Sequence, residues 1–228
     1  MFRAVIFDFN GVLVDDEPIH LRLFREVLAE EGIELSAEDY YAHYLGFDDR
    51  GCFEAVLKAA GETPTTSRVV RLIARKSSYY QDLVRREGYP FFPGAITLVR
   101  ALADANVPLG LVSGALRDEI EGALAQEGLL QCFKVLVTAE DVALGKPDPE
   151  GYRRGLDELN ATPPLPHRLL HPHEVVAIED SPAGIAAARG AGLATLGVAQ
   201  TYPLAELGSA DRAVLRVADL TVAQVLGE

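Results

Sequence analysis

Several features that define other protein classes are scarce in this sequence. Cysteine occurs only twice among 228 residues, at Cys52 and Cys132, without the spacing of metal ligands. We therefore expect no disulfide and a reducing, cytoplasmic environment. Basic residues are also few, with 21 Lys and Arg against 34 Asp and Glu and a net charge of −13. General nucleic-acid binding requires a basic surface, so this class of function is excluded.

Long apolar runs are missing as well. No segment approaches the roughly 20 apolar residues of a membrane-spanning helix, and no basic segment followed by an apolar one precedes the first predicted strand. We therefore expect a soluble protein without a membrane partner, as a monomer or weak dimer. With 49% hydrophobic residues and no internal repeat, the chain can bury one sizeable core and a smaller second domain.

The first predicted strand ends at an acidic residue. The segment RAVIFDF is short, β-branched and aromatic, and Asn10-Gly11 is a turn signal that stops it. Asp8 therefore lies at the carboxyl end of a strand, where open α/β sheets bind ligands. A carboxylate there can attack phosphorus or carbon, or bind a hard cation. A turn-capping role explains this segment alone equally well.

Three later segments place polar residues at comparable positions. A second apolar strand ends at Ser113-Gly114, where a hydroxyl and backbone N–H groups can hold phosphate oxygens. Lys146 precedes two prolines in a rigid loop, where its ammonium can act as a point charge on phosphate. A further buried strand ends at Glu179 and Asp180, two acids that can hold Mg²⁺ beside the first carboxylate.

Each segment has an ordinary structural explanation when it is taken alone. Ser113 can be a helix cap, Lys146 a solvated loop charge, and the acidic pair an N-cap that favours the helix dipole. Their order along the chain, with all of them at predicted strand ends, favours one shared site.

In these four segments the chain resembles the haloacid dehalogenase superfamily of phosphatases and phosphomutases, over nearly its whole length. The resemblance implies a Rossmann-like parallel sheet with helices on both faces and an inserted helical cap. It also implies that Asp8 forms an aspartyl-phosphate while Ser113 and Lys146 orient and neutralise the transferring group. Gly11 and Gly114 belong to the implied substrate-binding set. The implied Mg²⁺ ligands are Asp8, the main-chain carbonyl of Asn10, Glu179 and Asp180.

The segment after the first strand changes from strand to helical periodicity. Apolar spacing predicts helices over 18–31, 37–45, 50–60 and 67–86, and the strand–helix alternation resumes at the Phe92-Pro93-Gly94 turn. We assign residues 1–14 and 92–228 to an α/β core domain and residues 15–91 to a helical cap domain. This insertion resembles the sugar-phosphate-directed branch of the family.

Three residues of the predicted cap extend the resemblance to β-phosphoglucomutase-like enzymes and sugar-phosphate phosphatases. His20, Arg50 and Lys76 are spaced as in that branch. The resemblance implies that Arg50 clamps a distal phosphate or acidic group of the substrate, and that His20 and Lys76 lie near the hinge or entrance. Solvated Arg and Lys side chains, and a His on an amphipathic helix, remain the alternative explanations.

Asn10 departs from the family pattern. In the family, an acid at this place protonates the leaving alcohol and later deprotonates the attacking water or acceptor. General acid–base catalysis contributes about 10²–10⁴-fold, and a neutral amide cannot supply it. We predict a Mg²⁺-dependent phosphatase-like hydrolase acting on a small phosphorylated metabolite, with a sugar phosphate favoured and weakened acid–base chemistry. Asp15, Asp16 or His20 can serve as a substitute acid.

Three other functions are compatible with parts of this pattern. A phosphomutase depends more heavily on an acid at residue 10, so Asn10 argues against it. A dehalogenase attacks carbon and tolerates the missing acid, but those relatives resemble this chain less around Gly11-Val12 and Glu179-Asp180. A Mg²⁺ requirement would separate the two functions. A non-catalytic relative would keep phosphate affinity without turnover, although such a module has less need of Asp8.

One connection is longer than its place in the chain requires. Residues 160–174 (NATPPLPHRLLHPHE) contain His167, His171 and His173, which suggest a metal site. The prolines favour an extended loop, however, and no further Cys or His is close in sequence. We interpret this segment as an ordinary surface insertion.

Overall fold

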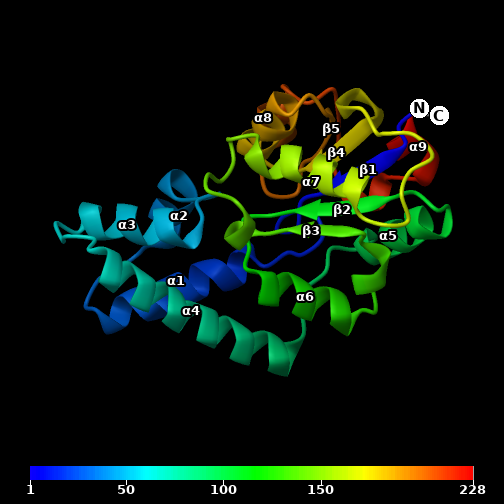
Figure 1. Cartoon of the computed structure of the whole chain (residues 1–228). Coiled ribbons are helices and arrows are strands. Elements are labelled where there is room, and N and C mark those ends of the chain that lie inside the picture. Colours follow the sequence, from blue (N-terminus) through cyan, green and yellow to red (C-terminus); the bar gives the residue numbers. More distant parts are fainter. Residues whose placement is uncertain (228) are drawn as a thin grey trace. The chain divides into compact units, whose positions relative to one another are not determined.

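The computed structural model describes residues 1–227, and the chain divides into two compact units. The sheet unit combines Met1–Asp15 with the chain from Pro90 onward, and the helical unit is Asp16–Tyr89. Figure 1 shows that every strand belongs to the first and that the second contains helices only. No helix among residues 1–227 is both long and apolar enough to cross a membrane.

A six-stranded parallel sheet forms the centre of the sheet unit, in the order β3-β2-β1-β4-β5-β6. The central strands are buried and apolar apart from Glu179 at the end of β4, as is typical of parallel sheets that are covered on both faces. The strands are β1 (Ala4–Phe7), β2 (Leu109–Val112), β3 (Val135–Val137), β4 (Val175–Glu179), β5 (Ala194–Val198) and β6 (Arg212–Val214).

Helices cover both faces of this sheet (Figure 1). On one face, Tyr152 and Leu156 of α7 and Ala187 of α8 pack with Ile6 and Ala177 in a buried cluster. Helices α5 and α6 lie on the opposite face (Figure 1). The predicted Rossmann-like α/β fold is therefore confirmed. The helices are α5 (Ala95–Asp104), α6 (Arg117–Gln126), α7 (Glu150–Ala161), α8 (Pro182–Gly190) and α9 (Val222–Leu226). Short 3₁₀ helices are η1 (Leu130–Cys132), η2 (Ala139–Asp141), η3 (Pro172–Glu174), η4 (Leu204–Leu207) and η5 (Val217–Asp219).

The helical unit has a hydrophobic core of its own. Phe24 of α1 packs edge-on against Phe53 of α3, with ring centroids 5.0 Å apart, and Leu72 of α4 joins the same buried cluster. Side chains of Ser36 and Asp48 cap the second and third helices by accepting backbone N–H groups. The four helices are α1 (Glu17–Glu30), α2 (Ala37–His43), α3 (Asp49–Ala59) and α4 (Thr66–Glu87), within a residue or two of the ranges that periodicity predicted.

The strand order places the ends of β1 and β4 side by side. Phe7, the last residue of β1, pairs with Leu111 of β2 on one side and with Ile178 of β4 on the other. Strands β2 and β3 follow β1 on one side, and β4, β5 and β6 follow on the other. The order of strands therefore reverses between β1 and β4. In open α/β sheets such a point forms the ligand-binding crevice at the carboxyl ends of the strands.

Candidate active site

Three buried carboxylates meet at this reversal point. Asp8 follows β1, Glu179 ends β4 and Asp180 comes next. One carboxylate oxygen from each lies within 4.8 Å of the other two, and all three side chains are buried. Among residues 1–227 this is the one group of three or more His, Cys, Asp or Glu side chains placed to share a metal ion. Oxygen donors of this kind suit a hard divalent cation such as Mg²⁺.

The pKa values of two of these acids are raised, as burial beside other carboxylates requires. The pKa of Asp8 is raised to about 7, because burial raises it more than the charge of Lys146 lowers it, and the nearby Glu179 acts in the same direction as burial. Burial also raises the pKa of Asp180 well above its usual range, and repulsion from Asp8 and Glu179 acts in the same direction. A bound divalent cation would favour the ionised forms, so the donor set fits such an ion.

Lys146 is joined to two of these acids. Its ammonium lies 2.6 Å from Asp8 Oδ1 and 2.6 Å from Glu179 Oε1, and 5.5 Å from the ring centroid of Tyr152. Burial alone would lower the pKa of Lys146, but the carboxylates of Asp8 and Glu179 raise it above its usual range. The lysine is therefore a fixed positive charge at the site and not a solvated loop residue.

Ser113 lies at the end of β2 and faces the loop after β1. Its hydroxyl donates to Asn10 Oδ1 at 3.3 Å and accepts the backbone N–H of Ala115 at 3.0 Å. The N-cap of α6 is Leu116, so Ser113 is not the cap of that helix. Gly114, next in the chain, is exposed and has open space around the position of a Cβ.

The turn after Asn10 requires glycine. Gly11 has a φ of +76°, and a Cβ at this position would lie 1.9 Å from Asp180 Oδ2. The side chain of Gln200 fixes the turn from the other side, because its Nε2 donates to the Gly11 carbonyl at 2.7 Å and its Oε1 accepts from Val217 N at 2.8 Å. Sequence reasoning missed Gln200, and no local pattern distinguishes it.

The acids also have hydrogen-bond partners that sequence reasoning did not identify. Tyr152 donates its hydroxyl to Glu179 Oε1 at 2.5 Å, and Ser181 donates to Oε2 of the same residue at 3.2 Å. A side-chain hydrogen bond from Thr201 lowers the pKa of Asp180, against the larger opposite effect of burial. Burial raises the pKa of Tyr152 well above its usual range, so its hydroxyl keeps its proton and remains a donor.

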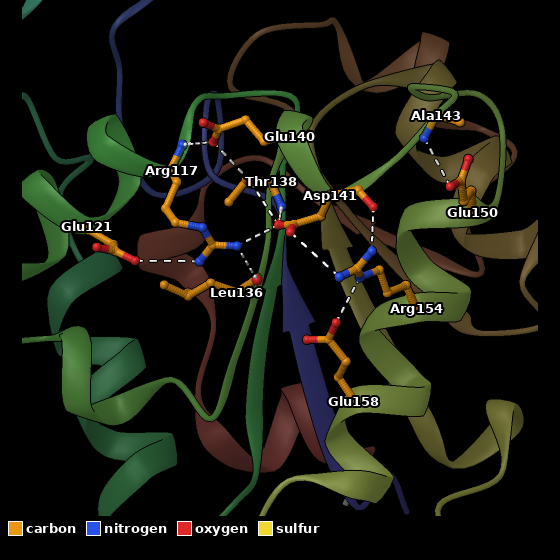
Figure 2. Close-up of polar contacts among 10 residues, drawn as sticks. All are labelled: Arg117, Glu121, Leu136, Thr138, Glu140, Asp141, Ala143, Glu150, Arg154 and Glu158. Carbon is orange, nitrogen blue, oxygen red and sulfur yellow. Dashed lines mark hydrogen bonds and ion pairs between the residues drawn. The ribbon is translucent and has the colours of Figure 1, made fainter.

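The loop that carries Lys146 is tied to the start of α7. Glu150 accepts the backbone N–H group of Ala143 at 3.0 Å (Figure 2). It also accepts the backbone N–H group of Leu144 at 3.0 Å. These hydrogen bonds lower the pKa of Glu150. The Glu150 carboxylate, at the end of the Lys146 loop, thus holds the beginning of the same loop.

A neighbouring network connects the end of β3 with two helices (Figure 2). Asp141 Oδ2 accepts from Arg117 of α6 at 2.5 Å and from Thr138 Oγ1 at 2.8 Å, while Arg154 of α7 donates to the Asp141 carbonyl at 2.5 Å. Burial alone would raise the pKa of Asp141, but its hydrogen bonds from Thr138 and the charge of Arg117 lower it. Asp141 therefore links elements that flank the Ser113 and Lys146 loops.

Two of the predicted cap residues lie together inside the helical unit. Lys76 is 1% exposed and its ammonium lies 2.7 Å from His20 Nδ1 and 2.5 Å from Asp49 Oδ1. His20 Nε2 contacts Asp16 Oδ2 at 3.2 Å. Burial and the charge of Lys76 lower the pKa of His20, but Asp16 outweighs them and the pKa is raised. Arg50, the third predicted residue, is exposed at the start of α3.

The histidines of the long connection do not gather into a site. His171 and His173 stack with ring centroids 5.7 Å apart, and both are exposed, as is His167. The segment is tied down by Glu174, which accepts two hydrogen bonds from Arg168 and one from the backbone N–H of His171.

Comparison with known proteins gives a family and several relatives. The family model of haloacid dehalogenase-like hydrolases matches residues 2–192. The chain is 31% identical over 222 residues to a validoxylamine A 7'-phosphate phosphatase from Streptomyces hygroscopicus subsp. limoneus, covering 92% of each chain. It is 29% identical to the β-phosphoglucomutase of Bacillus subtilis, covering 96% of this chain and 92% of the relative.

A solved structure extends the likeness to the whole fold. CbbY from Rhodobacter sphaeroides, as a variant with one Asp replaced by Asn and in complex with xylulose-1,5-bisphosphate, matches with a TM-score of 0.85 and 26% identity over 99% of both chains. The parallel sheet, the carboxylate and lysine cluster at its carboxyl edge, and these similarities lead to one conclusion. The chain belongs to the haloacid dehalogenase-like hydrolases, the family that its four motifs predicted.

Proposed function

We propose that this protein is a Mg²⁺-dependent phosphatase that acts on a small phosphorylated metabolite, preferably a sugar phosphate. The observation that carries the proposal is the cluster of three buried carboxylates joined to Lys146 at the carboxyl ends of the strands. The relatives support the substrate class, because their names refer to a phosphatase, a phosphoglucomutase and a bound sugar bisphosphate.

Asp8 is the nucleophile in this proposal. One of its carboxylate oxygens forms a bond to phosphorus as the P–O bond of the ester breaks, which gives an aspartyl-phosphate and a leaving oxygen that takes its proton from solvent. Water then attacks the same phosphorus, the bond to Asp8 breaks, and inorganic phosphate leaves. Lys146 supplies fixed positive charge 2.6 Å from Asp8, and Ser113 supplies a hydroxyl donor for a phosphate oxygen.

The metal would be held by Asp8, Glu179 and Asp180, with the main-chain carbonyl of Asn10 as a further ligand. When bound, it would neutralise charge on the phosphoryl oxygens. The raised pKa values of Asp8 and Asp180 support this assignment, since they reflect buried acids with too little positive charge around them.

Asn10 limits the acid–base part of the reaction. The leaving alcohol needs a proton when its oxygen separates from phosphorus, and a carboxamide cannot provide one. The Asn10 side chain instead accepts a hydrogen bond from Ser113. We therefore propose slow turnover of alkyl phosphates and faster turnover of esters with stable leaving groups.

Substrate selection is assigned to the helical unit. Arg50 is exposed and can form paired hydrogen bonds with a second phosphate or a carboxylate. Lys76 is buried and held by His20 and Asp49, so we assign His20 and Lys76 to the support of the substrate-binding surface.

The test is a screen of sugar phosphates, nucleotides and p-nitrophenyl phosphate, with Mg²⁺ and with a chelator. We expect Mg²⁺-dependent phosphate release from the aryl ester and from a subset of the sugar phosphates. Isomerisation of a sugar phosphate without phosphate release would instead establish a phosphomutase. Binding of phosphate with no turnover of any ester would contradict an enzymatic role.

A further inference from the structure

The Glu179 carboxylate has an unusually complete set of partners. Its side chain is fully buried, and its Oε1 receives both the Lys146 ammonium at 2.6 Å and the Tyr152 hydroxyl at 2.5 Å. Its Oε2 receives the Ser181 hydroxyl at 3.2 Å. Lys146 also contacts Asp8, whereas the Tyr152 hydroxyl donates its hydrogen bond to Glu179.

Tyr152 is held rigidly behind this acid. The side chain is fully buried in the cluster that α7 forms with the sheet, where Ile6, Val112 and Leu156 are among its members. Gly155, one turn later on α7, lies so close to the sheet that a Cβ there would be 3.0 Å from Val112. A buried tyrosine needs a partner for its hydroxyl, and this ring presents its hydroxyl to a single carboxylate.

We propose that Tyr152 is a positioning residue of the metal site. Its hydroxyl fixes the Glu179 carboxylate in the orientation in which Glu179, Asp8 and Asp180 can share one divalent cation. The inference rests on the proposed function, since it takes these three acids as the ligands. Lys146 has a flexible stem and divides its charge between two acids, whereas the tyrosine ring is fixed by packing, so Tyr152 supplies the rigid constraint.

The expected effect follows from other metal sites. Loss of a group that hydrogen-bonds a ligating side chain typically weakens metal binding by about 10–100-fold. Tyr152→Phe removes only the hydroxyl and keeps the ring that packs in the core and lies beside Lys146. We therefore expect the Mg²⁺ affinity to fall by about tenfold.

Tyr40→Phe is a matched control. Tyr40 is also a buried tyrosine, and its hydroxyl donates to the carboxylate of Glu17 at 2.5 Å, but both residues lie in the helical unit. The two variants therefore lose the same kind of bond. Mg²⁺ binding to the full-length chain is measured by calorimetry without substrate, and the affinity of Tyr40→Phe is expected to equal that of the unaltered protein.

A double-mutant cycle identifies the route of the effect. If Tyr152 acts through Glu179, Tyr152→Phe produces no further loss of affinity in a Glu179→Gln background. A less stable Tyr152→Phe variant remains informative, because the rise of its Tm with Mg²⁺ concentration reports affinity relative to its own metal-free state.

The outcomes separate the inference from the proposed function. An unchanged or tighter Mg²⁺ affinity in Tyr152→Phe would overturn the role of Tyr152, as would an equal loss in Tyr40→Phe. If the unaltered chain binds no Mg²⁺, the proposed function itself fails, and the positioning role fails with it.

Discussion

Asn10 and Asp8 leave the same strand two residues apart, but only Asp8 can carry a charge. The structure gives Asp8 a lysine partner at 2.6 Å and gives Asn10 a serine hydroxyl at 3.3 Å. The proposed nucleophile and the lysine proposed to neutralise phosphate are therefore in direct contact. The proton donor that would complete the site is absent at residue 10.

Asn10→Asp is expected to restore acid catalysis. The new carboxyl has nearly the shape of the amide and lies near buried acids, which raises its pKa and favours the protonated donor. We expect kcat for alkyl phosphates to rise by about 10²-fold, the lower end of the usual contribution of a general acid. Aryl phosphates are expected to gain much less, because a phenolate leaves without a proton.

The control for this prediction is to show that the unaltered protein contains no deamidated Asn10. The Asn10-Gly11 pair is prone to deamidation, so intact-mass analysis of the unaltered protein should accompany each assay. Equal rates for Asn10→Asp and the unaltered chain on both ester classes would show that another residue supplies the proton or that phosphoryl transfer is not the reaction.

The same scale shows how far the sequence predicts the site. Asp8, Ser113, Lys146 and the Glu179-Asp180 pair were identified because each adjoins a strand end or a proline-rich turn, which are local signals. Gln200 was not identifiable, since its partner Gly11 lies 189 positions away in the sequence. Tertiary pairing of this kind has no local pattern.

At the scale of elements, Arg50 belongs to α3 of the helical unit. In the proposed function, the Arg50 guanidinium pairs with a distal anionic group and the sheet unit binds the reacting phosphate. Arg50→Ala is therefore expected to raise KM for the preferred sugar phosphate about tenfold. This corresponds to the loss of about one charged hydrogen bond. The kcat/KM for p-nitrophenyl phosphate should stay nearly constant.

Arg71→Ala serves as the control, since Arg71 is another exposed arginine of the helical unit, on α4. It is expected to leave both substrates unaffected. An equal loss of kcat/KM on both substrates in Arg50→Ala would assign Arg50 to the chemical step or to folding of the helical unit.

The Lys146 loop gives a second prediction at this scale. Glu150 accepts two backbone N–H groups of the loop, one with each carboxylate oxygen, and a glutamine can reproduce only one of these acceptors. Glu150→Gln is therefore expected to loosen the loop and lower kcat/KM for p-nitrophenyl phosphate several-fold, while the Mg²⁺ affinity changes little. Unchanged steady-state kinetics would show that the loop does not depend on this anchor.

Three of the six strands and the four helices of the helical unit were predictable from the sequence. Apolar runs bounded by turn residues marked β1, β2 and β4, and helical periodicity marked the four helices of the helical unit. The two edge strands, β3 and β6, have only three residues each, which is too few for a periodic signal. Their pairing partners are known only from the folded sheet.

At the scale of the whole molecule, metal binding, stability and pH are linked through Asp8. The pKa of its carboxyl rises from the ordinary 3.8 to about 7 in the folded chain. Between these values the unfolded chain has lost the proton that the folded chain keeps, so the metal-free protein loses stability as pH rises and the loss levels off above pH 7.

Mg²⁺ requires the ionised acids, so its binding should release protons and strengthen with pH. We expect a larger Mg²⁺-induced rise in Tm at about pH 8 than at about pH 6, since the pKa of Asp8 lies between. Asp8→Asn should abolish most of this difference. An equal rise at both pH values in the unaltered chain would contradict the assigned pKa of Asp8.

The most direct test of the central claim uses a mimic of the aspartyl-phosphate. Beryllium fluoride forms such a mimic only on a carboxylate nucleophile beside a bound cation, so thermal unfolding is measured with Mg²⁺ and beryllium fluoride together. We predict a large rise in Tm for the unaltered chain and for Asp157→Ala, which changes an exposed acid of α7. Asp8→Ala should show no rise beyond that caused by Mg²⁺ alone. The same beryllium fluoride response in Asp8→Ala as in the unaltered chain would contradict Asp8 as the nucleophile.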